Sequence, residues 1–165
     1  MRTIITDLSR KDISKLNVSK DDVIFFCNEC KNRCRGCFNC WVKHPTKCMY
    51  KDNYSNIVNY LKQSKELIII SKNRYGVYSS GVKKVVERCI GYLLPYLTIR
   101  YGRIHHSSRY LQKLNFKCYF YGNINNRDRV CLKNLVESNS INLNTLNYKV
   151  YYVKNIKELK NAFND

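Results

Sequence analysis

Runs of consecutive apolar residues constrain the fold of this chain most strongly. Residues 66–71, Glu-Leu-Ile-Ile-Ile-Ser, and residues 23–27, Val-Ile-Phe-Phe-Cys, are short, apolar and bounded by polar residues. Such runs predict strands buried on both faces, which are typical of parallel sheets covered by helices. β-Branched or alternating segments at 2–8, 115–122 and 146–153 predict three further strands.

Helical periodicity fills the gaps between these strands. We expect helices over four segments, 52–63, 81–97, 127–140 and 156–163, and one or two helical turns over 9–17. Pro95 is expected to end or kink the second helix, and residues 98–113 predict a surface excursion without a clean period. Strands alternating with helices predict an α/β fold with a mainly parallel, five-stranded sheet. Because the chain has the size of one domain and contains no linker, we expect residues 1–165 to form a single domain.

Cysteines cluster directly after the second predicted strand. Four of them have the spacing C-x2-C-x2-C-x7-C: Cys34, Cys37, Cys40 and Cys48. Thiolates this close in sequence can converge on one point, and soft sulfur ligands suit zinc or an iron–sulfur cluster. The spacing is typical of cluster loops, whereas no second compact Cys or His pair follows, as a zinc finger would require. Zinc, a redox-active dithiol and free thiols remain the alternatives, and His44 could join a zinc site.

The other cysteines predict less. Cys27 and Cys30 form a second C-x2-C just upstream, and Cys27 is expected in the core. Cys89, Cys118 and Cys131 fall on apolar faces of predicted elements, so we expect small buried side chains.

The cysteine segment also resembles a known family. Residues 34–48, Cys-Arg-Gly-Cys-Phe-Asn-Cys-Trp-Val-Lys-His-Pro-Thr-Lys-Cys, are similar to the C-x-G-C-F-x-C-W-x-K-x-P-x-x-C signature of small flavodoxin-like proteins. These are the NADPH-dependent FMN reductases and the iron–sulfur flavoproteins. Residues 71–83 resemble the family's S-P-x-Y-x-G-x-x-S-x-x-x-K motif. Asp52-Asn53 stands where the family has Asp-Asp, and Glu87-Arg88 where it has Asp-Arg.

The resemblance implies a flavodoxin-like doubly wound sheet and flavin-dependent electron transfer. FMN is the implied cofactor, NAD(P)H the implied donor, and a [4Fe-4S] cluster would bind Cys34, Cys37, Cys40 and Cys48. In such sheets ligands lie beyond the carboxyl ends of the strands. The flavin ring is therefore expected on the loop after the third strand: Tyr75, Gly76, Val77, Tyr78, Ser79 and Ser80. An ordinary turn with two exposed tyrosines is the alternative. Because the cysteine loop follows a strand, we also expect any metal there to lie near this crevice.

The phosphate-binding loop of the family is not matched. The family has a G-S-x-R-x-x-S/G-N loop after its first strand, whereas this chain has Thr-Asp-Leu-Ser-Arg-Lys at residues 6–11. Ser9 and Arg10 could substitute in part, but no glycine is present and Asp7 repels phosphate. FMN would then bind weakly, or another basic group would compensate. Alternatively, the chain is a flavodoxin-like remnant without flavin that serves as a metal-bearing or basic interaction module.

Composition narrows the remaining functions. The net charge of +18 comes from scattered lysines and arginines rather than from a cluster, so we do not expect a nucleic-acid interface. No run has the length of a membrane span, and the N-terminus lacks the pattern of a signal peptide, so we expect a cytoplasmic protein. The 12 acidic residues make carboxylate catalysis a poor candidate. By resemblance we expect a homodimer, with the apolar run at residues 92–97 as a candidate contact.

Overall fold

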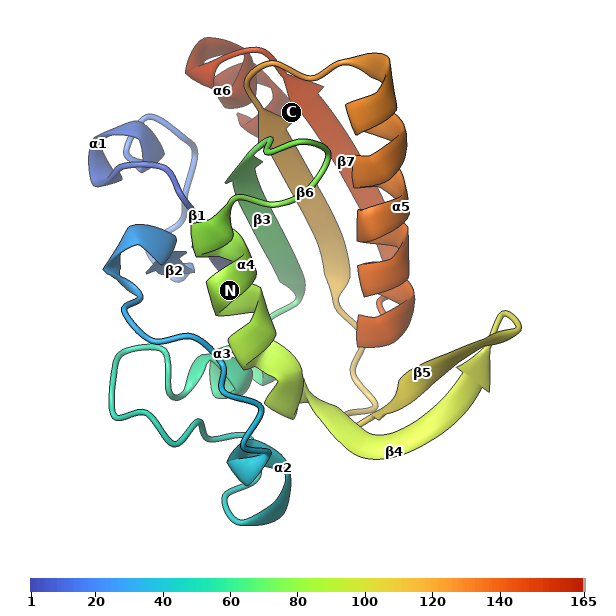
Figure 1. Ribbon diagram of the computed structural model, residues 1–165. Coiled ribbons are helices and arrows are strands. Elements are labelled where there is room, and N and C mark those ends of the chain that lie inside the picture. Colours follow the sequence, from blue (N-terminus) through green and yellow to red (C-terminus); the bar gives the residue numbers. More distant parts are fainter. Residues whose placement is uncertain (165) are drawn as a thin grey trace.

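The centre of the molecule is a five-stranded parallel sheet. The structure is a computed structural model that describes residues 1–164. The strand order is β2-β1-β3-β6-β7 (Figure 1). The strands are β1 (Arg2–Thr6), β2 (Val23–Phe26), β3 (Glu66–Lys72), β6 (Asn115–Tyr121) and β7 (Asn147–Val153). All five predicted strands are therefore confirmed, as is their doubly wound order. The single domain over 1–165 stays a prediction, and its residue 165 lies outside the described residues.

Helices cover both faces of the sheet. One face carries α3 (Ile57–Gln63), α4 (Ser80–Glu87) and α5 (Asn126–Leu143), and the other carries α1 (Arg10–Ile13) and α6 (Ile156–Asn164) (Figure 1). Side chains alternate along each strand, so neighbouring residues enter different cores. Ile5 and Ile69 pack beneath the first set of helices, whereas Ile4, Ile68 and Ile70 pack beneath the second. The apolar runs found in the sequence thus fill two cores.

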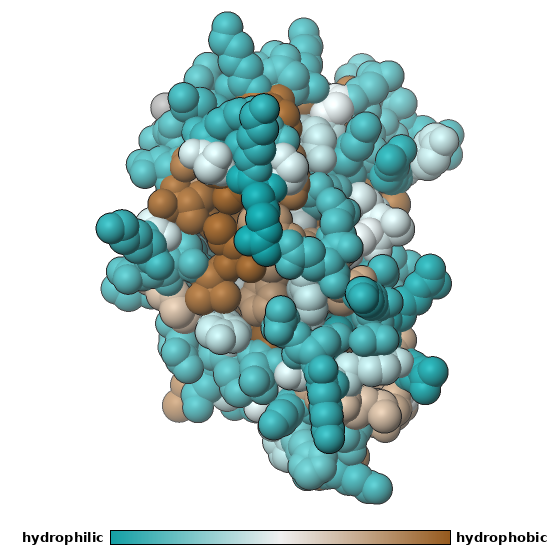
Figure 2. All heavy atoms as spheres, turned by 90° about the vertical axis from the view of Figure 1, so that its left-hand side faces the viewer, coloured by the Kyte–Doolittle hydropathy of each residue, from teal (hydrophilic) through white to brown (hydrophobic). Residues whose placement is uncertain are grey.

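Strand β2 lies at one edge of the sheet. Its Val23, Ile24 and Phe26 stay partly exposed, and only Phe25 is buried. Figure 2 views the molecule from this side and shows one hydrophobic strip on a largely hydrophilic face. Within residues 1–164, no helix is both long enough and apolar enough to cross a membrane.

The predicted helix over 81–97 is wrong in its second half. Helix α4 ends at Glu87, and a 3-10 turn, η2 (Arg88–Tyr92), follows it. The chain then forms β4 (Leu93–Arg100), which pairs antiparallel with β5 (Arg103–Ser108). The apolar residues at helical spacing extend only to Leu93, where the strand begins. The short apolar run at 93–97 fits a strand as well as a helix. Tyr101 and Gly102 form the two-residue turn, with φ values of 50° and 71° that suit a tight hairpin.

This hairpin and a long loop lie at the amino end of the sheet. The loop between β2 and α3 contains η1 (Cys27–Glu29) and α2 (Asn39–Val42). In Figure 1 the loop descends from the top of β2 to α2 at the bottom, and the hairpin projects from the same end. The helix predicted to begin at Asp52 begins at Ile57, because the Asp52 carboxylate accepts the N–H of Tyr54 and forms a turn first.

Candidate functional site

The crevice of this sheet lies between the carboxyl ends of β1 and β3. The chain leaves β1 toward one edge of the sheet and β3 toward the other, which makes this the switch point. Asp7, directly after β1, occupies it. Its carboxylate accepts the N–H of Lys72 at 3.0 Å and the hydroxyl of Tyr121 at 3.1 Å. Burial and the Asp7 charge raise the pKa of Tyr121, so this hydroxyl stays protonated and donates.

The residues predicted to meet a phosphate are engaged with protein groups. Ser9 caps α1: its hydroxyl accepts the N–H of Asp12 at 3.1 Å and donates to the Asp12 carboxylate at 2.7 Å. Arg10 donates to Glu29 at 2.7 Å, and its guanidinium lies 4.4 Å from the centre of the Phe26 ring. Helix α1 has only four residues, so it adds little of the dipole that favours an anion at a helix start. Ser9 and Arg10 thus lie near the crevice without forming an open anion site.

The turn after β3 is held by side chains on both sides of it. Tyr75 and Gly76 have left-handed φ values of 56° and 79°, and the N–H of Gly76 bonds to Asn73 Oδ1 at 2.9 Å. The side-chain amide of Asn73 donates to Asp128 at the start of α5. A Cβ at Gly76 would lie 2.7 Å from the Cβ of Cys131. Glycine is therefore needed where the turn packs on α5.

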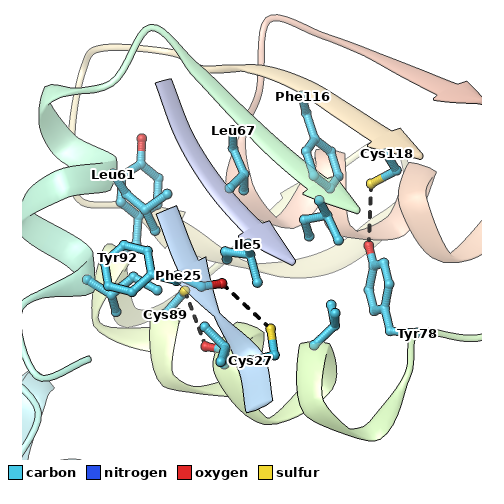
Figure 3. Packing of buried hydrophobic residues seen from close by; sticks show 14 of the residues in the cluster. Ile5, Phe25, Cys27, Leu61, Leu67, Tyr78, Cys89, Tyr92, Phe116 and Cys118 are labelled. Carbon is cyan, nitrogen blue, oxygen red and sulfur yellow. Dashed lines mark hydrogen bonds between the residues drawn. The ribbon is translucent and has the colours of Figure 1, made fainter. Parts of the chain in front are cut away.

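The two tyrosines of this turn have different environments. Tyr75 is 96% exposed. Tyr78 is buried, stacks on Phe120, and accepts a hydrogen bond from Asn139 at 3.1 Å while lying 3.7 Å from Cys118 Sγ (Figure 3). Burial raises the pKa of Tyr78 well above its usual value. Of the two predicted aromatics, only Tyr75 presents its ring to solvent.

Of the remaining predicted residues of the turn, one caps helix α4 and two lie on the surface. Ser79 caps α4 by accepting the N–H of Val82 at 3.4 Å, and its own N–H bonds to Ser71 Oγ at 2.8 Å. Val77 and Ser80 are exposed. The turn therefore offers a ligand the Tyr75 ring, the Val77 side chain and the Ser80 hydroxyl.

The four cysteines of the C-x2-C-x2-C-x7-C motif come together. Cys34, Cys37, Cys40 and Cys48 line one small cavity of about 30 Å³. Burial raises the pKa of Cys40, and the other three thiols add to this effect through their proximity. However, within residues 1–164 no group of three or more Cys, His, Asp or Glu side chains is placed to hold a single metal ion. The four thiols therefore share one cavity, and a metal bound by them remains a prediction.

The cysteine cavity lies away from the crevice. Trp41 donates its indole N–H to the carbonyl of Ile90 at 3.0 Å, and a Cβ at Gly91 would lie 3.2 Å from the Cβ of Cys40. Both contacts are to η2, at the far end of α4 from the Tyr75 turn. Figure 1 shows α2 and the β3–α4 connection at opposite ends of the molecule. The expectation that a metal here would lie near the crevice is wrong, because the loop runs back along α4 after leaving β2.

Comparison with solved structures bears on the fold. The chain is similar to an FMN-dependent NADH-azoreductase from Bacillus anthracis str. Ames Ancestor in complex with FMN, with a TM-score of 0.58 and 11% identity over 99% of this chain and 94% of that one. It is also similar to an NADH:FMN oxidoreductase in its apo form, with a TM-score of 0.57 and 8% identity over 99% of this chain and 80% of that one. The fold is flavodoxin-like. No family model matches the sequence, and no curated protein does.

One ion pair in this flavodoxin-like fold was not predicted from the sequence. Arg88, whose side chain is fully buried, pairs with Asp52 through two contacts of 2.7 Å. Its guanidinium carbon lies 5.6 and 5.7 Å from the ring centres of Tyr50 and Tyr54, and Nη1 lies 3.6 Å from Cys30 Sγ. Burial alone would raise the pKa of Asp52, but hydrogen bonds from Arg88 and other neighbours hold it below its usual value.

This pair ties the cysteine loop to the end of α4. Arg88 also lines the cysteine cavity, so the ion pair holds the cysteine loop next to that cavity. The sequence contained a signal for it, since both residues fall in dipeptides that resemble the family. Their 36-residue separation gave no means of pairing them without the fold.

Proposed function

We propose that this flavodoxin-like chain is a flavin-dependent electron-transfer protein that binds FMN and uses NAD(P)H or a donor protein. The observation that carries the proposal is the exposed Tyr75 turn beside the switch-point crevice, on a fold shared with two structures whose names specify FMN chemistry. When bound, FMN supplies hydride and electron transfer, while the protein positions it.

The ring end and the phosphate end of the site fit FMN unequally. The N–H groups of Gly76, Val77 and Ser79 already bond within the protein, so the Tyr75 ring is the main group that the turn offers. At the other end, Arg10 would have to leave Glu29 to reach a phosphate. Together with the Asp7 carboxylate, this competition supports a weak FMN affinity.

A spectrum and a titration test the proposal. Anaerobically purified protein should be yellow, or should quench the fluorescence of added FMN and then oxidise NADPH or NADH with an electron acceptor. Exchanging Tyr75 for Ala should weaken FMN binding, whereas Tyr96→Ala, at a 69% exposed tyrosine of the hairpin, should not. A colourless protein that leaves flavin fluorescence unchanged at high micromolar concentration would contradict the flavin proposal.

For the cysteine centre we propose a [4Fe-4S] cluster on Cys34, Cys37, Cys40 and Cys48. The common cavity supports it, and so do Arg35 and Arg88, whose positive charges line that cavity and would offset the negative charge of a thiolate-ligated cluster. A single tetrahedral zinc would need all its sulfurs at about 2.3 Å from one point, and within residues 1–164 no three such side chains are placed on one ion. A cluster spreads its ligands over several iron atoms.

Metal analysis tests this assignment. Anaerobic protein should contain iron and acid-labile sulfide, and replacing any of the four cysteines by Ser should deplete both, since oxygen is a poor substitute for thiolate on iron. The expectation of a buried Cys131 is wrong, since this cysteine is exposed on α5. Cys131→Ser is therefore the matched control and should retain the cluster. Stoichiometric zinc, or four freely titratable thiols after reconstitution, would overturn the cluster.

A second candidate is a flavodoxin-like module without flavin that bears a metal at the cysteine loop. The occupied phosphate subsite favours it, because Asp7, Ser9 and Arg10 are all satisfied by protein groups. Colour separates the candidates: a yellow protein indicates flavin, a brown one a cluster, and a colourless one zinc or free thiols.

Pairing of two copies is a further proposal, and the hairpin supplies its surface. Within the predicted contact at 92–97, Tyr92 and Leu93 are buried core, whereas Leu97 is 65% exposed. The register pairs Ile99 with Ile104 and Leu97 with His106, so these side chains share one face. We call it the hairpin face, comprising Leu97, Ile99, Ile104 and His106.

The occupant proposed for the hairpin face is a second copy of this chain. Arginines 100 and 103 pair on the opposite face, where Arg100 bonds to the carbonyl of Ile141. The hairpin face itself carries no Lys or Arg, although the chain has a net charge of +18. Two such chains repel each other, so a cation-free apolar face is where they can approach most readily.

A further inference from the structure

A second apolar cavity, separate from the crevice, lies between α4, α5 and the sheet. Its volume is about 410 Å³. The floor consists of Ile5, Leu67, Ile69 and Phe116, from three adjacent strands, and each is at most 3% exposed. Figure 3 shows Ile5, Leu67 and Phe116 on neighbouring strands of the sheet. The cavity is therefore recessed between helices rather than being a flat apolar face.

The lengths of the two helices explain the cavity. Helix α4 ends at Glu87, whereas α5 continues over 18 residues to Leu143. Beyond Glu87 the chain turns into η2 and then leaves in the hairpin, so the second half of α5 has no full helix beside it (Figure 1). The walls are completed by half-buried apolar side chains, among them Val86, Ile90 and Leu143.

Polar groups also line the cavity, and one of them is a carboxylate, which only accepts hydrogen bonds. Glu87 supplies this carboxylate, with Lys83 no closer than 3.8 Å. Asn139 donates its amide N–H to Tyr78, which leaves its oxygen available. Asn142 completes the polar lining, and among the described residues its side chain makes no hydrogen bond. Among residues 1–164 no Lys or Arg lines the cavity itself, so no lining cation is placed to pair with an anionic ligand.

We infer that this cavity binds an apolar ring compound that is neutral or cationic and carries a hydrogen-bond donor at one end. A largely apolar pocket of a few hundred Å³ with few polar groups is the usual form of a small-molecule site. The ring system would lie above the floor, between the half-buried walls formed by Val86, Ile90 and Leu143, and its donor or positive charge would face Glu87 and the two asparagines. FMN is excluded as the occupant, because its phosphate would meet a carboxylate and no cation.

The cavity also adjoins the cysteine centre. Cys34 and Ile90 line both cavities, and Trp41, the only tryptophan, bonds to the Ile90 carbonyl. A ligand in the apolar cavity would therefore lie within range of energy transfer from Trp41. Its binding can be located without any assumption about flavin or metal.

The test uses N-phenyl-1-naphthylamine, a neutral fluorophore made of a naphthalene and a phenyl ring joined by one N–H donor. Its fluorescence should rise and saturate with one probe per chain, and excitation of Trp41 should sensitise it. The double variant Val86→Phe with Leu143→Phe should fill the cavity and weaken binding at least about tenfold, a change of about 1.4 kcal/mol. Val130 of α5 is 60% exposed. Val130→Phe is therefore the matched control and should bind the probe like the native protein.

A second variant keeps the proposal testable if the filled protein does not fold. Glu87→Gln preserves shape and removes the carboxylate charge, so it should weaken the cation 9-aminoacridine about fivefold and leave the neutral probe unchanged. Non-saturating fluorescence, absence of energy transfer from Trp41, or equal binding by the filled variant would overturn the proposal. Equal binding of the cation by Glu87→Gln would overturn the assigned orientation and class.

Discussion

Asp7 places a carboxylate at the point where a flavodoxin-like crevice would receive the phosphate end of its ligand. The native hydrogen bonds from Lys72 and Tyr121 stabilise the charge there. This residue is the main electrostatic obstacle to the proposed FMN site, and it can be removed without changing shape.

We therefore predict that Asp7→Asn binds FMN about tenfold more tightly than the native protein. Asparagine keeps one oxygen, which can accept the Tyr121 hydroxyl, while its NH2 replaces the oxygen that accepts the Lys72 N–H. One negative charge near the phosphate disappears, worth on the order of 1 kcal/mol. Fluorescence titration with FMN measures the change. Asp21→Asn makes the same charge change on the exposed residue before β2 and should leave Kd unaltered. Equal affinities for both variants would place the phosphate elsewhere.

The Asp52–Arg88 pair should contribute strongly to the free energy of unfolding. Asp52→Asn leaves the fully buried Arg88 guanidinium without its counter-charge, which should lower the free energy of unfolding by about 3 kcal/mol. Chemical denaturation measures it. Asp12→Asn, which breaks the exposed pair with Lys15, should cost less than about 1 kcal/mol.

The pH dependence of this effect follows from the lowered pKa of Asp52. A carboxyl whose folded pKa lies below its usual 3.8 stabilises the protein fully above that value and loses the contribution as the pH falls through the folded pKa. The stability gap between native protein and Asp52→Asn should therefore be constant near neutral pH and narrow below pH 3.8. A gap that persists unchanged through acid would show that packing, not charge, explains it.

At the scale of elements, the turn after β3 is fixed by its contact with α5. Gly76 and Gly102 both have left-handed φ values, but only at Gly76 would a Cβ collide with another element, at 2.7 Å from Cys131. The two glycines therefore separate backbone strain from the cost of disturbing this contact.

We predict that Gly76→Ala lowers the free energy of unfolding by about 2–3 kcal/mol, and Gly102→Ala by only about 1 kcal/mol. The first change combines the strained φ with a collision against α5, and the second has the strained φ alone. Denaturant unfolding of both variants supplies the comparison. If the two alanines cost the same, the turn can move away from α5 without loss, and the Tyr75 position is less fixed than proposed.

At the scale of the whole molecule, charge and the hairpin face together determine association. With a net charge of +18, two copies repel at long range, and salt screens that repulsion. An apolar contact between hairpin faces should therefore strengthen as ionic strength rises, in contrast to a contact made by ion pairs.

We predict a dimer of about twice 19.6 kDa by light scattering, more populated at high salt than at low salt. Leu97→Asp and Ile99→Asp should each produce a monomer, because each buries an unpaired charge in the proposed contact. Leu111→Asp, at a fully exposed leucine away from the hairpin face, should remain a dimer. A native monomer across concentrations and salt, or dimers of all three variants, would contradict the proposed surface.

The sequence by itself determined the layers of this protein. Apolar runs such as residues 66–71 predicted strands buried on both faces, and amphipathic segments between them predicted covering helices. It also indicated that Cys34, Cys37, Cys40 and Cys48 lie near one another, as their common cavity shows, because their spacing is local. Local patterns suffice wherever the interacting residues are a few positions apart.

Only the tertiary structure decided what depends on contacts between distant segments. Tyr75 and Tyr78 are indistinguishable in the sequence, yet one is exposed and the other faces Cys118 in the core. The switch from helix to strand after Glu87 was equally undetermined, because apolar residues there fit both periods. The cysteine loop lies at the amino end of the sheet because Trp41 and Arg88 bind it to η2 and α4. Long-range packing of this kind leaves no periodicity in the chain, so it cannot be predicted from local pattern.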